Sequence, residues 1–364
     1  MKKMIIFIPS IENGGVEKNL FIVANYFRKK GIYIEILTCN TNFSKKFANG
    51  IKFIGPKNKF WFKKDRIVKY TYCLLSLFFN LLFKKNKPLL FAFQANIYAI
   101  FVAKIFNAKI ITRSNSAPAG WSKNPFKLFI YKFLINLADD VMVNSLEFKK
   151  SFERKFKLRV TCIYNPFDKV FIKKKILSKI DKDLFKKNFL NIVSVGRLTD
   201  QKDQLTLLKS ISLLKYNLKI KLFIIGNGPK YNLLKNFITT YKLQDKVKLL
   251  GYLSNPYPYI NKSDMIILTS KFEGLPNILL EAQYLKKYII STDCPTGPNE
   301  ILLNGRAGDL VNVGDSKKIA YLIANFNKRK YIIKKKIKLG FNNFDRFNYN
   351  FNCKKYLDFA NKNF

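Results

Sequence analysis

Histidine is absent from this chain of 364 residues, and acidic residues, paired cysteines and long apolar runs are scarce. The absence of histidine excludes Ser-His and Cys-His nucleophile systems and every metal site that needs an imidazole ligand. None of the five cysteines forms a C-x-x-C pair. Cysteines scattered over a chain of this length are typical of a reducing compartment, and they argue against a disulfide framework or a zinc site.

No apolar run is long enough to cross a bilayer. The longest, at 70–83, falls short of the roughly 20 residues that a membrane-spanning helix needs. The run Met4–Ile8 is too short for the core of a signal peptide, and no small-residue cleavage site follows it. We therefore expect neither a transmembrane segment nor a signal peptide, and we expect a cytoplasmic location.

Acidic residues are outnumbered, because 23 Asp and Glu stand against 67 Lys and Arg, which gives a formal net charge of +44. Such a balance predicts an anionic partner, which can be a nucleic acid, a membrane surface or a phosphorylated substrate. A genomic bias toward Lys, Asn, Ile, Phe and Tyr also explains many of the lysines. It does not explain the scarcity of acids.

The length and a hydrophobic fraction of 48% predict two domains with separate cores. Short apolar runs alternate with longer segments of helical period, which is typical of parallel sheets built from βαβ units. Strands are predicted at 4–8, 33–38, 89–93, 109–112, 141–144, 160–163, 191–195, 221–225, 246–250, 265–268, 288–291 and 309–311. Helices are predicted at 16–28, 96–106 and 203–214.

Turn-forming residues at 164–168, followed by a highly charged segment at 169–187, indicate where the first domain ends. The predicted domains are therefore 1–168 and 169–340. The tail at 341–364 is expected to form a helix that packs back on the first domain.

The loops that follow strands hold the informative residues, because ligands of open parallel sheets bind at the carboxyl ends of the strands. In the first of these loops Gly196 lets the chain turn, and Arg197 and Lys202 place two cations before the next helix. The planar fork of arginine and the point charge of lysine suit the oxygens of a diphosphate. A solvated basic loop is the alternative in so basic a chain.

A second loop carries two carboxylates, Glu273 and Glu281, on either side of Pro276. Because proline favours the first turn of a helix, a helix is expected to begin near Pro276. Its free N–H groups would attract phosphate, and the carboxylates would accept hydrogen bonds from sugar hydroxyls. The alternative is a capping acid and a surface acid, but Glu281 lies in an apolar run, where an unpaired charge is costly.

Two further loops are less specific. Gly14 and Gly15 stand between the first predicted strand and helix and allow a ligand to approach the backbone closely. They are not part of a G-x-G-x-x-G fingerprint, and a plain turn explains them equally well. The loop at 293–300 follows a strand and is rich in proline, and its last residue, Glu300, can simply cap a helix.

Taken together, these motifs resemble the retaining glycosyltransferases of family 4, also called glycosyl transferases group 1. The resemblance is clear over about residues 190–315 and thinner before that. The matching stretches are Gly14-Gly15 near the start, S-V-G-R-L-x3-K at 194–202, I-I-G-N-G-P at 224–229, L-L-G-Y at 249–252, E-G-L-P-N-x3-E at 273–281 and S-T-D-C-P-T-G-P-N-E-I at 291–301. The resemblance implies the α/β fold called GT-B, in which two Rossmann-like domains with parallel sheets face each other across a cleft.

The resemblance also implies roles for single residues. Arg197 and Lys202 match the pair that binds the donor diphosphate, Glu273 matches the glutamate that touches the transferred sugar, and Glu281 matches the one that holds the ribose hydroxyls. The catalytic set is thus Glu273, Arg197 and Lys202. The remaining residues of the implied donor site are Gly14, Gly15, Asn227, Gly228, Gly274, Leu275, Pro276 and Asn277.

Such enzymes use neither a metal ion nor a cofactor, because cations and a helix N-terminus neutralise the leaving group. They retain the anomeric configuration by front-face attack, in which the leaving phosphate helps to deprotonate the acceptor. Many relatives carry a histidine in the first domain, where this chain has the stretch 112–116 without histidine. Arg113 and Asn115 are candidates for contact with the acceptor or sugar there, although an asparagine cannot act as a base.

The segment 60–87 is aromatic, basic and apolar. A helix of this kind either lies in a membrane interface or packs in the core of the first domain. The net charge favours peripheral attachment to an anionic membrane and a lipid-linked glycan acceptor in bacterial surface polysaccharide, lipopolysaccharide or glycoprotein assembly. The loop at 293–300 is similar to that of family members that use a UDP carrier with a hexose or N-acetylhexosamine, and this resemblance implies such a donor.

Three other functions compete with this interpretation. A nucleic-acid-binding protein would share the charge, but the chain has no recognised reader motif and spreads its lysines over its whole length, so no nucleic acid partner is expected. A GT-B nucleotide-sugar epimerase needs catalytic acids and bases, which the absence of histidine disfavours. A GT-B subunit without activity would not need the complete set of Arg197, Lys202, Glu273 and Glu281.

Overall fold

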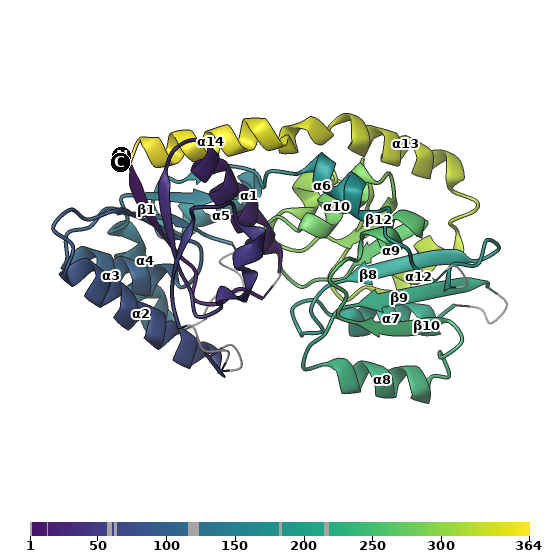
Figure 1. Ribbon diagram of the computed structural model, residues 1–364. Helices are drawn as coiled ribbons and strands as arrows, with labels where there is room; N and C mark the ends of the chain where they lie inside the picture. Colours follow the sequence, from purple (N-terminus) through teal and green to yellow (C-terminus); the bar gives the residue numbers. More distant parts are fainter. Residues whose placement is uncertain are drawn as a thin grey trace. The chain divides into compact units, whose positions relative to one another are not determined.

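A computed structural model describes residues 2–12, 14–56, 60–61, 64–115, 124–181, 184–214 and 218–364. The chain folds into two compact units, and each is built around its own parallel β-sheet (Figure 1). The N-terminal unit comprises Met1–Pro166 together with Phe347–Phe364, and the C-terminal unit comprises Phe167–Arg346.

The N-terminal unit has a seven-stranded sheet in the order β3-β2-β1-β4-β5-β6-β7. Its strands are β1 (Lys3–Phe7), β2 (Tyr33–Leu37), β3 (Lys52–Ile54), β4 (Leu89–Ala92), β5 (Ile110–Arg113), β6 (Asp140–Val143) and β7 (Thr161–Cys162). Its helices are α1 (Gly15–Lys29), α2 (Arg66–Leu82), α3 (Asn96–Ile105), α4 (Pro125–Asn136), α5 (Leu146–Phe156) and α14 (Tyr349–Asn361), with a short 3-10 helix at Thr41–Lys46.

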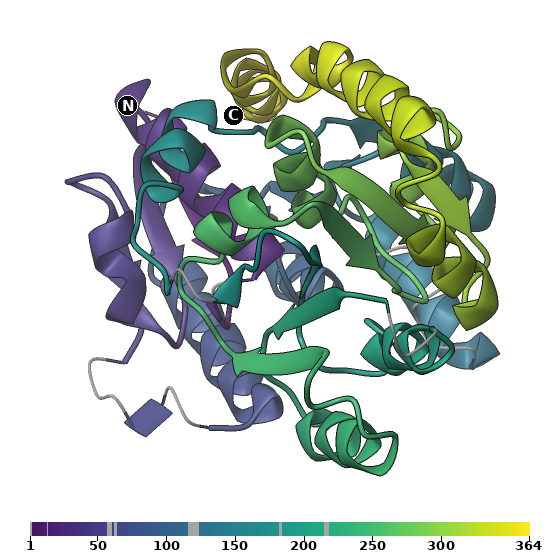
Figure 2. The same cartoon turned by 90° about the vertical axis from the view of Figure 1, so that its right-hand side faces the viewer.

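Helices cover both faces of this sheet, so its central strands are apolar on both sides. Met4 and Ile6 of β1 join a core cluster with α1 and α14, whereas Ile5 and Phe7 join a second cluster with α2, α3 and α5. The last helix lies beside the first residues of the chain, where the ammonium of Lys2 donates a 2.6 Å hydrogen bond to Oδ1 of Asn361 (Figure 2).

The C-terminal unit has a six-stranded sheet in the order β10-β9-β8-β11-β12-β13. Its strands are β8 (Leu190–Val195), β9 (Ile220–Ile225), β10 (Val247–Gly251), β11 (Met265–Leu268), β12 (Tyr288–Thr292) and β13 (Asp309–Val311). Its helices are α6 (Lys169–Lys175), α7 (Gln204–Ser212), α8 (Tyr231–Thr240), α9 (Tyr257–Lys262), α10 (Asn277–Tyr284), α11 (Pro298–Ile301), α12 (Ser316–Ala324) and α13 (Lys330–Asn342), and a 3-10 helix at Phe344–Phe347 runs from this unit to the other.

All strand pairs given for the two sheets are parallel, as the alternation of strands and helices predicts. One described strand, the edge strand β3, was not predicted, and none of its three residues is buried. The charged segment after Asp168 also contains a helix, α6, whose first turn is capped by the Asp168 carboxylate at 2.8 Å from the amide of Phe171.

In the part of the chain that the structure describes, no helix has the length and apolar character that a membrane span requires.

Candidate functional site

The strand order of the C-terminal unit determines where a ligand can bind. Numbered along the chain, the six strands lie in the order 3-2-1-4-5-6. Strands β9 and β10 are added on one side of β8 and strands β11 to β13 on its other side, so the strand order reverses between β8 and β11. In doubly wound sheets a crevice opens at this switch point, beyond the carboxyl ends of the two strands. The loops that follow β8 and β11 hold Arg197, Lys202 and Glu273, so the three predicted catalytic residues lie at the switch point of one sheet.

An ion pair joins these two loops. The ammonium of Lys202 contacts Oε1 of Glu273, and the hydroxyl of Ser270 donates a 2.6 Å hydrogen bond to the same oxygen. The Glu273 side chain is only 8% exposed and that of Lys202 18%. A buried carboxylate is costly unless it is paired and hydrogen-bonded, and here it is both.

Main-chain contacts hold the ion pair in place. The hydroxyl of Thr269 donates to the carbonyl of Lys202 at 3.1 Å, and the amide of Lys271 donates to the carbonyl of Gln201 at 2.8 Å. The side-chain amide of Gln201 returns a 3.0 Å hydrogen bond to the carbonyl of Phe272. Because three hydrogen bonds fix the two loops to each other, Lys202 and Glu273 are pre-positioned.

A third loop, at 293–297, packs on Glu273. The amide of Glu273 donates to the carbonyl of Pro295 at 2.8 Å, and the hydroxyl of Thr296 donates to the carbonyl of Glu273 at 3.1 Å. A side chain on Gly297 would bring its Cβ to 1.9 Å from the carbonyl oxygen of Gly274, so only glycine fits there. Burial raises the pKa of the neighbouring Cys294 thiol to about 12, with a further contribution from the negative charge of Glu273.

Glu281 lies inside helix α10 and is 4% exposed. The hydroxyl of Tyr257, at the start of α9, donates a 3.2 Å hydrogen bond to its Oε1. Helix α10 begins at Asn277, directly after the buried residues Gly274, Leu275 and Pro276, close to where the sequence predicts it. Glu281 therefore has a partner in the core and is not a surface acid.

Arg197 is exposed, unlike Lys202 and Glu273. Within the described residues its guanidinium has no hydrogen-bond or ion-pair partner, which leaves its donors available for an anion. The loop of Arg197 is also bonded to the loop after β9, because the amide of Leu198 donates to the carbonyl of Asn227 at 2.9 Å. Asn227 itself is exposed beside this loop.

Glycine at 226 and 228 makes this close approach of two loops possible. A Cβ on Gly226, whose φ is +149°, would lie 1.8 Å from the carbonyl oxygen of Gly196. A Cβ on Gly228 would lie 2.4 Å from the carbonyl oxygen of Leu198. The I-I-G-N-G-P motif therefore packs its backbone directly against the loop of Arg197.

The N-terminal unit has its own switch point, between β1 and β4. Gly14 is the N-cap residue of α1 and Gly15 its first residue, while Asn13 lies outside the described residues. The buried carboxylate of Glu17 accepts a 3.3 Å hydrogen bond from the side-chain amide of Gln94 in the loop after β4. A Cβ on Gly14 would meet Glu17 Oε2 at 2.8 Å, so the glycine makes room for this carboxylate.

Arg113, expected near the acceptor or sugar, lies in the core at the end of β5 and is 1% exposed. Its guanidinium donates to the hydroxyl of Tyr356 at 2.8 Å, to Oδ1 of Asn165 at 2.7 Å and to Oδ1 of Asn115. Three of its five N–H donors are thus engaged inside the unit, so Arg113 has a structural role, and its contact with an acceptor or sugar stays a prediction. Asn115 is only half-buried and remains a candidate, with its amide 2.5 Å from the carbonyl of Phe93.

Several residues at these sites were not predicted. Ser270 and Glu17 each lie three residues from a predicted residue along the chain, and the position of Glu17 in the first turn of a helix was a usable indication. Tyr257 reaches Glu281 from another helix, and Gln94 reaches Glu17 from another loop. No local pattern indicates either of those contacts.

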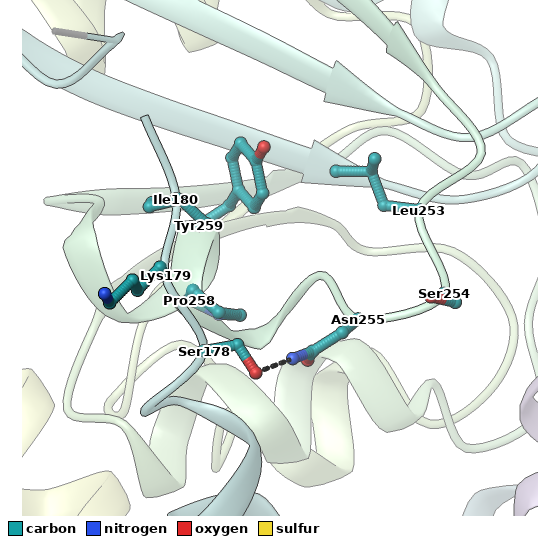
Figure 3. A pocket seen from close by; sticks show the side chains of 8 residues that line it. All are labelled: Ser178, Lys179, Ile180, Leu253, Ser254, Asn255, Pro258 and Tyr259. Carbon is teal, nitrogen blue, oxygen red and sulfur yellow. Dashed lines mark hydrogen bonds between the residues drawn. The ribbon is translucent and has the colours of Figure 1, made fainter. Parts of the chain in front are cut away.

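A separate cavity of about 250 Å³ lies elsewhere in the C-terminal unit (Figure 3). Two of its lining residues are hydrogen-bonded to each other, because the side-chain amide of Asn255 donates to the hydroxyl of Ser178 at 3.0 Å. The residues that line it are Ser178, Lys179, Ile180, Leu253, Ser254, Asn255, Pro258 and Tyr259. None of them is a predicted site residue, so this cavity is not the candidate site. Among the described side chains, no group of three or more Cys, Asp and Glu could hold a metal ion.

Comparison with known proteins shows what the C-terminal unit is similar to. Residues 177–339 match the model described as glycosyl transferases group 1. The chain is 34% identical over 256 residues to an uncharacterized glycosyltransferase of Methanocaldococcus jannaschii, a match that covers 65% of this chain and 62% of that relative. The chain thus spans less than two thirds of that protein's length.

A second relative matches over more of its length. The chain is 29% identical over 332 residues to the N-acetylgalactosamine-N,N'-diacetylbacillosaminyl-diphospho-undecaprenol 4-alpha-N-acetylgalactosaminyltransferase of Campylobacter jejuni, covering 86% of this chain and 87% of that relative. These matches confirm the predicted resemblance to glycosyl transferases group 1.

Solved structures agree on the fold. The sucrose-phosphate synthase of Thermosynechococcus elongatus aligns with a TM-score of 0.81 at 15% identity, covering 100% of this chain and 99% of that one. HepE of Anabaena, solved in complex with UDP-glucose, aligns with a TM-score of 0.79 at 17% identity, covering 100% of both chains. The predicted α/β fold with two Rossmann-like domains of the GT-B type is confirmed.

Proposed function

Residues 177–339 match the model of the glycosyl transferases group 1 family, and from that premise we propose that this chain is a retaining glycosyltransferase. It moves a hexose or an N-acetylhexosamine from a nucleotide diphosphate sugar, with UDP as the carrier, to a glycan acceptor. The observation that carries the proposal is the buried ion pair of Lys202 and Glu273 at the switch point of the C-terminal sheet. The exposed Arg197 stands in the same loop as Lys202.

In the proposed complex the two cations, Arg197 and Lys202, bind the diphosphate. Glu273 accepts hydrogen bonds from hydroxyls of the transferred sugar, and Glu281 accepts them from the ribose. Asn227, Gly228 and the segment 274–277 line the same site in the C-terminal unit. The UDP-glucose bound by HepE supports UDP as the carrier.

The reaction exchanges one bond at the anomeric carbon for another. The bond from this carbon to the phosphate oxygen breaks, and the bond to the acceptor oxygen forms on the same face, which retains the configuration. The proton of the acceptor hydroxyl passes to the leaving diphosphate. Arg197 and Lys202 stabilise the negative charge that develops there, so the proposal includes neither a metal ion nor a cofactor.

The proposed acceptor is a lipid-linked glycan in the assembly of a bacterial surface polysaccharide, lipopolysaccharide or glycoprotein glycan. The relative from Campylobacter jejuni supports this, because its name gives a diphospho-undecaprenol acceptor. We place the protein on the cytoplasmic side of the cell membrane as a peripheral protein. In this proposal the net charge of +44 serves diphosphate and membrane binding and not nucleic acid binding.

A panel of nucleotide sugars tests the proposal. The purified chain is incubated with UDP-, GDP- and ADP-sugars, and release of the nucleoside diphosphate is measured together with thermal stabilisation by each donor. One donor should give slow hydrolysis or transfer. Glu273→Gln and Arg197→Ala should each lower that rate about a hundredfold or more, because each removes a contact to the reacting groups.

Arg306→Ala is the matched control, since Arg306 is an exposed arginine of the same unit whose guanidinium donates to the carbonyl of Leu303. It should retain the full rate. If no donor is turned over and none stabilises the protein, the assignment of the donor site is wrong. Equal losses in Arg197→Ala and Arg306→Ala would also contradict the role of Arg197.

A further inference from the structure

Helix α4 carries its apolar stripe on the outside. Only Ile135 of this helix is buried. Apolar side chains spaced three and four residues apart stand in solvent instead, with exposed fractions of 70% for Phe126, 68% for Phe129, 59% for Phe133 and 38% for Ile130 and Leu137. This spacing places them on one side of the helix, and in a soluble protein such a stripe normally faces the core.

The neighbouring helices extend this surface. Helix α2 lies against α3, and α3 lies against α4 (Figure 1). The buried apolar residues of all three belong to one core cluster, so the helices cover the same face of the sheet and their outer sides form one surface. Its exposed apolar residues outside α4 are Ile67, Val68, Leu75, Phe79, Leu82, Phe83, Tyr98, Phe101 and Ile105. We call this surface, with the stripe of α4, the α2–α4 face.

All the charged side chains in the segment that contains α2, α3 and α4 are positive. From Arg66 to Leu137 the sequence has eleven Lys and Arg and no Asp or Glu. Lys127 and Lys132 of α4 are exposed between the phenylalanines. The first acids on either side are Asp65 and Asp139, and Asp139 is paired with Lys104 at 2.8 Å.

We propose that the α2–α4 face binds an anionic phospholipid bilayer, with the phenylalanines of α4 inserted at the boundary of headgroups and acyl chains. An apolar patch of this extent on a soluble protein indicates an interaction surface. Aromatic side chains with lysines beside them suit a bilayer interface, because the rings enter the apolar layer while the flexible lysines reach the phosphates. The absence of acids matches the negative surface of such a membrane.

This inference rests on the proposed function for one point only, that a lipid-linked acceptor gives the protein a reason to be at a membrane. Its test needs neither donor nor acceptor. The full chain is sedimented with vesicles of phosphatidylcholine alone and with vesicles that also contain phosphatidylglycerol. The wild type should bind the vesicles with phosphatidylglycerol and be partly released by salt.

The apolar part is tested with the double variant Phe129→Ser and Phe133→Ser. Its affinity for the anionic vesicles should fall about tenfold or more, because two rings no longer enter the interface. The control is Phe351→Ser on α14, a phenylalanine that is 54% exposed on the helix covering the opposite face of the same sheet. It should bind like the wild type.

The charged part is tested with Lys127→Glu and Lys132→Glu together, which should lower the affinity about tenfold or more. Lys317→Glu and Lys328→Glu reverse two exposed lysines of the C-terminal unit and should leave it unchanged. Thermal unfolding and hydrolysis of a soluble donor show that each variant is folded, so loss of membrane binding and loss of the proposed activity are measured separately.

Three outcomes would overturn the inference. Vesicle binding that does not change in the phenylalanine pair would show that no insertion occurs. Equal losses in the two lysine pairs would show that only the net charge matters. A wild type that ignores vesicles but is a dimer, and becomes a monomer in the phenylalanine pair, would make the face an interface between two copies of the chain.

Discussion

The hydroxyl of Tyr257 donates a hydrogen bond of 3.2 Å to Oε1 of Glu281, and both side chains are buried in the C-terminal unit. The two residues lie on different helices, α9 and α10. A buried carboxylate takes its orientation from its donors. Tyr257 is therefore a positioning residue for the carboxylate that we assign to the ribose hydroxyls.

Tyr257→Phe should weaken donor binding and leave the fold intact. The change removes one hydrogen bond to a charged group, which is worth about 1.5–3 kcal/mol, and part of that loss appears in the affinity. We expect the dissociation constant for UDP, measured by calorimetry, to rise about tenfold. Tyr259→Phe on the same helix is the control and should bind UDP normally, and equal affinities in both variants would contradict the role of Tyr257.

Arg113→Met should destabilise the N-terminal unit. The guanidinium is 1% exposed, and its removal leaves the hydroxyl of Tyr356 and Oδ1 of Asn165 without this donor. We expect the free energy of unfolding to fall by about 2–4 kcal/mol. The exposed Arg154→Met on α5 should change it by about 0.5 kcal/mol or less. Equally small changes in the free energy of unfolding of both variants would contradict the structural role of Arg113.

Gly226→Ala should disrupt the loop of Arg197, because the added Cβ would lie 1.8 Å from the carbonyl oxygen of Gly196. We expect lost donor stabilisation in a thermal shift assay together with a lower melting temperature. Gly251→Ala is matched to it, since this glycine also has a positive φ, +68°, but no atom within 4 Å of the added Cβ. It should show only the backbone cost of about 1 kcal/mol.

The Cys294 thiol makes stability depend on alkaline pH. Burial raises its pKa from the ordinary 9.0 to about 12, so the folded state holds the proton more tightly than the unfolded state. This contribution is complete below pH 9 and is lost as the pH rises toward 12, by up to about 1.4 kcal/mol per pH unit. The difference in unfolding free energy between the wild type and Cys294→Ala should shrink over this range. A constant difference would mean that the thiol has an ordinary pKa.

Most of the fold follows from periodicity in the sequence. The runs Met265–Leu268 and Asp309–Val311 are strands with the predicted ends, because each is a short apolar segment bounded by turn residues. Strand β3 was missed, although β13, which also has three residues at a sheet edge, was predicted. The two differ in burial, because Val311 of β13 is buried whereas no residue of β3 is. The order of the strands also needs the structure, because periodicity does not specify neighbours.

The candidate site was predictable where its residues share a loop. The spacing of Arg197 and Lys202, and the position of Glu273 before a helix, place them at the ends of two strands. Arg113 could not be placed in this way. Its partner Tyr356 is 243 positions away along the chain, and no local pattern indicates that contact. For the segment 60–87 the core alternative is confirmed on one side of α2, where Cys73 and Leu77 are buried. On the other side Leu75 and Phe79 are exposed, and the membrane interface stays a prediction.

The last helix, α14, belongs to the N-terminal unit although the whole C-terminal unit precedes it in the chain. Tyr356, Phe359 and Ala360 belong to the same core cluster as β1 and α1. A ribosome adding about 5–20 residues per second therefore needs roughly ten to forty seconds after Pro166 before it reaches this segment. During that interval the nascent N-terminal unit exposes the apolar surface that α14 later covers, and the guanidinium of Arg113 lacks its hydrogen bond to the hydroxyl of Tyr356. The first unit to be translated is thus the last to complete its core.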